Sequence, residues 1–440
     1  MATIFPLRWT YQVSLLIFLV GSVVSGAATS SKMFIIGRAI SGMGGSGIST
    51  SGLSIVASVT PLPKRPLLSG LVLSMFGIGT VVAPILGGAI TEKASWRWCF
   101  YINLPIGAVT IVALLLFMKN PQTKPGPSDG IPWYQKLDLI GCIIFLASVT
   151  MTLMALEWGG NQHAWDSSVI IGLFVGAGAG FGVFLAYEKH LGERAMIPFC
   201  HMVQRSTLLS IAYAFCLFAT SVVPIYYLPE WFQVVQGVSP LESGVRMLPS
   251  VLSQVVGVGV SGGLAKMIRY YNPIFFAGSI MLATAVGLYT TFTVSSTPDS
   301  HWLGFQILQG MGVGLGSQMP LLMVQTILEP TPKHIPMGIA LVMFGQFFGS
   351  SISQGISGSI FQNQLISQLE NHAGLNPAQV HQLLSAGSSR LQQNAHNAFP
   401  QLVPLVLEAY NHAVTGVFWV PLTASIMGFI AALGIEWIQL

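Results

Sequence analysis

The stretch GTVVAPILGG (Gly79–Gly88) puts three glycines and a proline inside a long apolar run. In a soluble helix an interior proline costs about 3 kcal/mol and each glycine about 1 kcal/mol. In lipid, hydrophobic attraction cannot hold helices together, and small residues stabilise them by letting their backbones approach closely. Gly79, Ala83 and Gly87 recur every four residues and so share one smooth helix face. With Pro84 bending the chain beside that face, the stretch predicts a kinked, tightly packed membrane helix.

The composition of the whole chain agrees with this interpretation. Of its 440 residues 52% are hydrophobic and only 7% are charged, against about 25% charged in an ordinary soluble domain. Apolar runs recur at close to the roughly 20 residues that cross a bilayer, and they do not alternate with the period of two that a β-barrel needs. We therefore expect an all-α polytopic membrane protein.

The apolar runs define about twelve spanning helices. They lie near 11–28, 33–57, 67–91, 99–118, 138–157, 168–187, 207–228, 244–264, 273–293, 302–327, 336–358 and 414–437. Between them we expect a partial N-terminal bundle (1–118), a cytoplasmic linker (119–137), two intervening helices (138–187), a cytoplasmic loop (188–206) and a C-terminal bundle (207–437). That last bundle includes an extracellular loop (359–412), in which 363–374 and 376–387 are amphipathic and predict short helices.

The basic residues orient these helices. Twelve of the 18 Lys and Arg residues fall on one set of alternate loops, five fall on the opposite set, and Arg38 lies inside a helix. Positive charge is retained on the cytoplasmic side, so both termini are expected to be cytoplasmic. We expect a multi-pass protein of the cell membrane rather than of the vacuolar membrane. The scattered basic residues give no sign of nucleic-acid binding.

Four ordered motifs carry a family resemblance. From Gly70 to Gly88 the chain reads G-x8-G-x3-A-P-x2-G-G, and before it stands GRAISGMGGSG (37–47). After it come WRWCFYINLPIG (96–107) and IYYLPEWFQVVQGVSPLESGVRMLP (225–249). These motifs resemble those of the major facilitator superfamily, and within it the drug:proton antiporters with fourteen spanning helices. Ala83 and Ser41 stand where that family has glycine and glutamine.

The resemblance implies two six-helix bundles around a central cavity, and export of a small molecule in exchange for protons without a cofactor. It assigns a conformational role to the antiporter motif, which here comprises Gly70, Gly79, Ala83, Pro84, Gly87 and Gly88. The family has two further helices before position 1, with an acidic residue in the first of them. The resemblance therefore implies an incomplete N-terminal bundle here.

Polar residues inside the predicted helices are the candidates for a substrate or proton pathway. Arg38 is expensive to bury, so we expect it to face a cavity or to pair with an acid. The amides on two successive helices are Gln306, Gln309, Gln318 and Gln325, then Gln346 and Gln354. They could contact varied ligands or could hydrogen-bond between helices, and the sequence leaves both readings open. Tyr213 is a candidate for stacking on an aromatic substrate. The glycines at 310, 312, 314 and 316 are assigned to packing.

Catalysis is not expected. The sequence GGSG (44–47) matches an intramembrane serine protease motif, but such a serine needs a histidine base on another helix. All nine histidines fall in loops or at helix ends, and no metal site is expected. The sequence and the resemblance together predict a proton-driven exporter of an amphipathic organic compound, such as a secondary metabolite, toxin or drug. The alternatives are an uptake transporter for a nutrient or iron chelate, and a truncated membrane remnant that does not transport.

Overall fold

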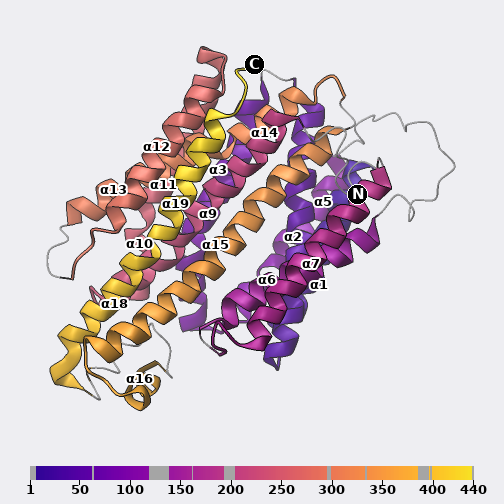
Figure 1. The fold of residues 1–440 in the computed structure, drawn as a ribbon. Helices are drawn as coiled ribbons and strands as arrows, with labels where there is room; N and C mark the ends of the chain where they lie inside the picture. Colours follow the sequence, from indigo (N-terminus) through magenta and orange to yellow (C-terminus); the bar gives the residue numbers. More distant parts are fainter. Residues whose placement is uncertain are drawn as a thin grey trace.

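The computed structural model describes residues 6–61, 64–117, 138–160, 162–192, 204–294, 299–331, 334–384, 396 and 399–438, with some side chains of the third helix left out. The described residues form a helical bundle (Figure 1). The first part of the chain comprises α1 (Leu7–Gly26), α2 (Ser31–Val59), α3 (Arg65–Lys93), α4 (Trp98–Tyr101), α5 (Asn103–Phe117), α6 (Leu139–Trp158) and α7 (Ser168–Leu191).

The second part contains the longer helices. It comprises α9 (Arg205–Val234), α10 (Pro240–Arg246), α11 (Leu248–Ile268), α12 (Asn272–Tyr289), α13 (Asp299–Ser317), α14 (Met319–Ile327), α15 (Ile335–Asn371), α16 (Pro377–Leu384), the 3-10 turn η6 (Pro400–Leu402), α18 (Val403–Val417) and α19 (Trp419–Leu433).

The predicted spans are present. Ten of the twelve correspond to helices or helix pairs of the described part that are long and apolar enough to cross a membrane, and the helices at the other two, α2 and α3, are not among those ten. The predicted spans 33–57 and 67–91 correspond to α2 and α3, which have 29 residues each. The predicted linker 119–137 lies outside the described residues. The fold class predicted from the sequence is therefore confirmed.

The distal end of the bundle, by which we mean the end opposite both chain termini, differs from the prediction (Figure 1). The helix predicted to stop at 358 continues as α15 to Asn371. It does so because Phe361, Leu365 and Leu369 recur every four residues, and all three are buried in the main hydrophobic core. The segment 359–412, predicted as an extracellular loop with short helices, contains the end of α15, the whole of α16 and the first part of α18. Of the two short helices predicted there, the first (363–374) is part of α15 as far as Asn371, and the second (376–387) contains α16.

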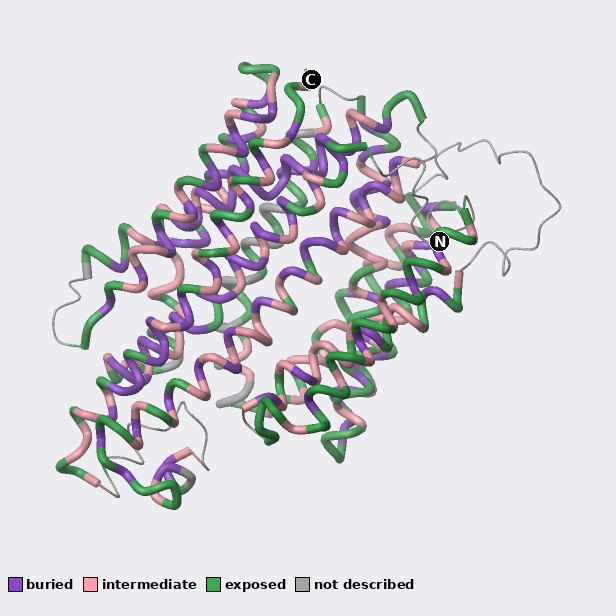
Figure 2. The backbone as a smooth tube through the Cα atoms, viewed as in Figure 1, coloured by how far each residue is buried: buried purple, intermediate pink, exposed green. Residues whose placement is uncertain are grey.

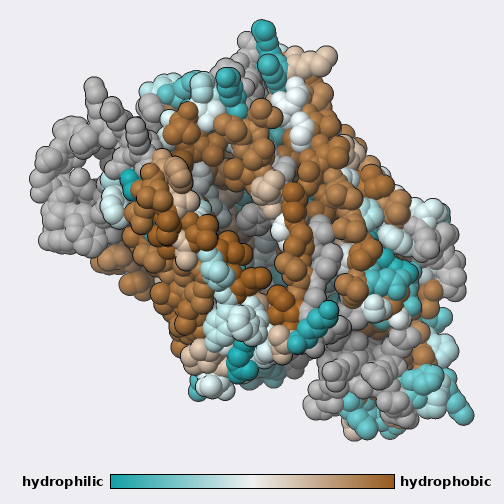
Figure 3. Space-filling view, turned by 180° about the vertical axis from the view of Figure 1, so that it is seen from behind, coloured by the Kyte–Doolittle hydropathy of each residue, from teal (hydrophilic) through white to brown (hydrophobic). Residues whose placement is uncertain are grey.

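The two parts of the chain differ in burial. Buried residues concentrate in the bundle from α9 onward, whereas α1, α2 and α5 to α7 are largely exposed along their outer faces (Figure 2). Much of the exposed surface is hydrophobic, and Figure 3 shows two apolar lobes with a hollow between them. Large contiguous apolar surfaces on a protein of this size are typical of contact with lipid.

Close backbone contact holds α13 between α11 and α12. A Cβ on Gly314 would lie 2.8 Å from the Cα of Gly257 in α11, and one on Gly278 of α12 would lie 3.0 Å from the carbonyl oxygen of Gly312. A Cβ on Gly316 would lie 2.5 Å from the hydroxyl of Tyr213. The packing role predicted for the glycines of α13 is therefore confirmed.

Candidate functional site

Three of the predicted amides are buried and have at least one side-chain atom without a hydrogen-bond partner among the described residues. Gln306 on α13 and Gln325 on α14 are fully buried, and neither atom of either amide is paired. Gln346 on α15 is 1% exposed, and its Nε2 is unpaired. An unpaired buried polar group costs about 1–3 kcal/mol, and natural proteins satisfy such groups with ordered water or a ligand. These three positions are the strongest candidates for a hydrated pathway or a substrate contact.

Two other predicted amides make hydrogen bonds between helices. The hydroxyl of Tyr289 on α12 donates to Gln309 Oε1 at 2.6 Å. Gln318, at the break between α13 and α14, donates through Nε2 to the carbonyl oxygen of Val258 at 3.0 Å and to the hydroxyl of Ser261. For Gln309 and Gln318 the geometry fits the alternative of hydrogen bonding between helices. Their role as pathway residues remains a prediction. Gln354 keeps an unpaired Oε1.

Tyr213 on α9 lies in the core of the second bundle, by which we mean the helices from α9 to α19. It is 1% exposed, its ring meets Phe275 edge-on at 4.5 Å between centroids, and its hydroxyl donates to the carbonyl oxygen of Phe275 at 3.5 Å. Its hydroxyl lies against Gly316, and its nearly complete burial leaves the ring no open side in this structure. The surroundings of Tyr213 therefore give no support to the predicted stacking on a substrate.

Arg38 is exposed on α2 rather than buried in it. Its guanidinium lies over the ring of Phe100 at 5.8 Å from the centroid. Among the residues that the structure describes, no carboxylate forms an ion pair with it. The expected acidic partner is not found in the described part of the chain.

The antiporter motif on α3 divides into a packed end and an open face. α3 lies against α11, and a Cβ on Gly70 would come within 3.1 Å of Gln318 Oε1 and 3.2 Å of Val258 Cγ1. Gly79 and Ala83 are exposed, and a Cβ on Gly79 or Gly87 would meet nothing within 4 Å.

The prediction that Gly79, Ala83 and Gly87 form a tightly packed face is therefore wrong for this conformation. The helix is rotated so that this face points away from α11, and the spacing of small residues alone could not fix that rotation. The side-chain surroundings of Pro84 and Gly88 lie outside the description. Among the motif residues whose surroundings are described, Gly70 is the one that lies at a contact between the two parts of the bundle.

A second contact between the two parts lies near the chain termini and was not predicted. Leu53 and Ala57 of α2 share one hydrophobic cluster with residues of α14 and α15, among them Leu321, Val324 and Ile339. The pattern of apolar residues in α2 shows that these side chains seek burial, but it does not show what covers them. The cluster packs α2 against α14 and α15 at this end of the bundle.

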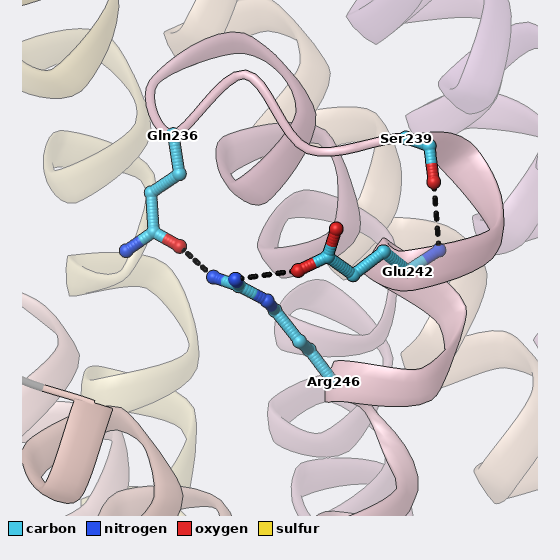
Figure 4. Close-up of polar contacts among 4 residues, drawn as sticks. All are labelled: Gln236, Ser239, Glu242 and Arg246. Carbon is cyan, nitrogen blue, oxygen red and sulfur yellow. Dashed lines mark hydrogen bonds and ion pairs between the residues drawn. The ribbon is translucent and has the colours of Figure 1, made fainter.

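The motif at 225–249 folds into a braced turn that joins α9 to α11 (Figure 4). Ser239 caps α10 by accepting the Glu242 N–H at 3.2 Å, and Arg246 forms an ion pair with Glu242 at 2.7 Å. Arg246 also donates to Gln236. The rings of Phe232 and Trp302 each lie 5.7 Å from its guanidinium, which ties α9 and α13 to the turn. This motif is structural here, since its polar groups bond with one another.

No group of His, Cys, Asp or Glu able to hold a metal ion occurs within the described ranges. The candidate site consists of the buried amides of α13, α14 and α15 and of the contact of α3 with α11 and Gln318.

Comparisons with known proteins address the whole chain. The sequence profile described as Major Facilitator Superfamily matches residues 1–354. The MFS-type transporter poxA of Penicillium oxalicum is 41% identical over 98% of this chain and 77% of its own length. The efflux pump aflT of Aspergillus parasiticus is 37% identical over 99% of this chain and 83% of its own, and the MFS-type efflux pump MFS1 of Trichophyton rubrum is 36% identical over 99% and 80%.

Solved structures show the same fold at low identity. A bacterial homologue of the human lysosomal transporter Spinster aligns with a TM-score of 0.57 at 14% identity, covering 98% of this chain and 84% of that one. The xylose transporter XylE of E. coli aligns with a TM-score of 0.53 at 13% identity, covering 98% and 80%. At this level of identity the likeness concerns the fold alone.

Proposed function

The chain belongs to the major facilitator superfamily, and from that membership we propose that it exports an amphipathic organic compound, with proton entry as the driving force. Membership makes it a transporter and not an enzyme. The proposed substrate class is a secondary metabolite, toxin or drug, and the proposed location is the cell membrane with both termini in the cytoplasm. The charge bias of twelve to five between alternate loops supports this orientation.

The observation that carries the proposal is the similarity to two proteins named efflux pumps over 99% of the chain. The antiporter-like motif on α3 supports the same direction of transport. Its first glycine lies at the contact with α11 and Gln318, where a change in packing would couple the two parts of the bundle. Transporters of this class alternate access by rocking one bundle against the other around a site near the bilayer midplane.

The uncharged amides support a substrate that is neither strongly acidic nor strongly basic. Gln306, Gln325 and Gln346 offer both donors and acceptors without the cost of a buried charge. Such groups accept hydrogen bonds from one compound and donate to another. We propose that these three side chains lie along the path of substrate or water, and that Gln309 and Gln318 maintain the helix packing around it.

Deletion of the gene tests export directly. Cells lacking the protein are expected to accumulate more of at least one compound from a panel of fluorescent hydrophobic molecules, because efflux no longer opposes diffusion inward. A protonophore should raise accumulation in parent cells to the level of the deletion strain and leave the deletion strain unchanged. Equal accumulation in both strains across the panel would contradict export, and lower accumulation in the deletion strain would favour uptake.

Two matched glutamine variants test the pathway. Gln306→Leu removes an amide that bonds to no described residue, so thermal stability in detergent should be maintained or raised while transport falls. Gln309→Leu leaves the buried Tyr289 hydroxyl without its acceptor and should lower stability by about 1–3 kcal/mol. Full transport by a well-folded Gln306→Leu protein would show that this amide does not serve the pathway.

A further inference from the structure

A polar cavity of about 540 Å³ lies at the distal end of the bundle, and Gln306, Gln325 and Gln346 are not among the described residues that line it. One wall is the outer extension of α15, where Gln364, Ser367 and Gln368 fall on one face of the helix. The opposite wall is formed by α18 and α19 through His412, Thr415 and Trp419, with Thr290 at the end of α12.

The cavity is separate from the interior of the bundle. On α18 the buried Tyr410 belongs to the main core, and its ring meets Phe361 at 5.4 Å. His412 follows two residues later, about 200° further around the helix, and it is exposed. α18 therefore stands between the cavity and the core, so that an occupant reaches the cavity from outside the bundle.

The hydrogen-bonding character of the walls is mixed, and His412 is the one titratable side chain among the described residues that line them. The hydroxyls of Thr290 and Thr415 donate to carbonyl oxygens of their own helices at 2.7 and 2.9 Å, and so present lone pairs to the cavity. Asn363 Nδ2 donates one of its two N–H groups to the carbonyl oxygen of Ser359 at 2.7 Å, so its Oδ1 accepts and its second N–H can donate. The amides of Gln364 and Gln368 supply both donors and acceptors.

This arrangement selects against a phosphate and for hydroxyl groups. Phosphate oxygens only accept hydrogen bonds, so they would face the lone pairs of Thr290 and Thr415, and no Lys or Arg is among the described residues that line the cavity. A hydroxyl both donates and accepts. An uncharged group bearing several hydroxyls, such as a sugar, can bond to the threonine oxygens and to the glutamine amides together.

The position of the cavity relative to the apolar surface indicates the source of that group. Trp419 is 59% exposed and begins a stripe along α19 that continues through the exposed Met427 and Ile430. Trp437, 62% exposed, lies just past the other end of that stripe. Exposed tryptophans that bracket an apolar stripe mark the two membrane–water interfaces. The cavity therefore lies at headgroup level, beside a surface suited to acyl chains.

We propose that this cavity binds the sugar headgroup of a membrane glycolipid, with the lipid chains lying along the outer face of α19. The proposal goes beyond the export function and does not depend on the direction of transport. It makes the junction of α12, α15 and α18 a lipid-dependent support for the distal end of the bundle.

The test uses the full chain purified in a detergent without a sugar headgroup, and probes it with glucosylceramide, ceramide, phosphatidylcholine and methyl glucoside. Glucosylceramide should raise the thermal midpoint and be retained as an adduct in native mass spectrometry. Ceramide has the same chains without the sugar, so it should be retained weakly, as should phosphatidylcholine. Methyl glucoside supplies the sugar without chains and should neither stabilise the protein nor displace the glycolipid at equal concentration.

The double variant Gln364→Met and Gln368→Met keeps the side-chain length and removes the hydrogen bonds, so it should lower glucosylceramide affinity about tenfold. Gln401→Met is the matched control, because Gln401 is exposed on the turn before α18 and does not line the cavity. Equal retention of ceramide and glucosylceramide, or unchanged glycolipid affinity in a folded double variant, would overturn the proposal. If methyl glucoside raised the thermal midpoint as much as glucosylceramide does, the ligand of the cavity would be a free sugar rather than a lipid headgroup, and the proposal would be overturned.

Discussion

Replacing Gly310 with alanine is expected to prevent stable assembly of the second bundle. The new Cβ would overlap the carbonyl oxygen of Ser250 and the hydroxyl of Ser253 on α11, and it would lie 2.9 Å from the backbone nitrogen of Gln254. Backbone atoms of a packed helix cannot turn aside as a flexible side chain can, so α11 and α13 must separate. Overpacking of a well-packed interior costs typically about 1–3 kcal/mol and more where backbone must shift.

The measurement is the fraction of protein recovered as a monodisperse peak in detergent, together with its thermal midpoint. Gly304→Ala is the control, because it makes the same chemical change on the same helix where a Cβ meets nothing within 4 Å. Alanine also has the higher helix propensity, so Gly304→Ala should fold at least as well as the parent. If both variants fold equally well, the close contact of α11 and α13 does not exist in the membrane.

The second large effect is expected at the antiporter motif. Gly70→Val puts a branched side chain where a Cβ alone would already lie 3.1 Å from Gln318 Oε1 and 3.2 Å from Val258. The contact between α3 and α11 must open, and the bond from Gln318 to Val258 is strained with it. A cost of about 1.4 kcal/mol on one conformation shifts the balance between conformations about tenfold, so transport should fall by about that factor or more.

Gly87→Val is the matched variant on the same helix, where a Cβ meets nothing within 4 Å. Its thermal midpoint should equal that of the parent, whereas that of Gly70→Val should fall. We expect Gly87→Val to transport poorly all the same, because we assign the open face of Gly79, Ala83 and Gly87 to close contact in another conformation of the cycle. Normal transport by Gly87→Val would show that this face has no conformational role. Normal transport by Gly70→Val would show the same for the contact of α3 with α11.

The spans could be predicted because their signal is local. Length and hydropathy within each segment decide whether it can cross a bilayer, and every predicted span corresponds to a helix or helix pair. The extension of α15 to Asn371 carried a weaker local signal in Phe361, Leu365 and Leu369, spaced four apart among polar residues. That signal identifies an amphipathic helix, but the continuation of α15 became evident only when the core that covers these three residues was known.

The candidate site could be predicted only in part. The sequence placed the amides on two helices, and it could not distinguish Gln309, which bonds to Tyr289, from Gln306, which bonds to no described residue. These two side chains are three residues apart on one helix and are chemically identical. Which of them meets a partner depends on a tyrosine of another helix.

By itself, the sequence determined the class of this protein, its spanning segments and its family, because hydropathy and motif spacing are properties of a continuous stretch of chain. Only the tertiary structure decided which small residues make contact. Gly310 lies against the backbone of α11, whereas a Cβ on Gly304 or Gly87 would meet nothing within 4 Å, and nothing in their local sequence distinguishes them. The physical reason is that a glycine permits close approach but does not attract a partner. The rotation of each helix, set by all the side chains that it buries, decides whether a neighbouring backbone lies there.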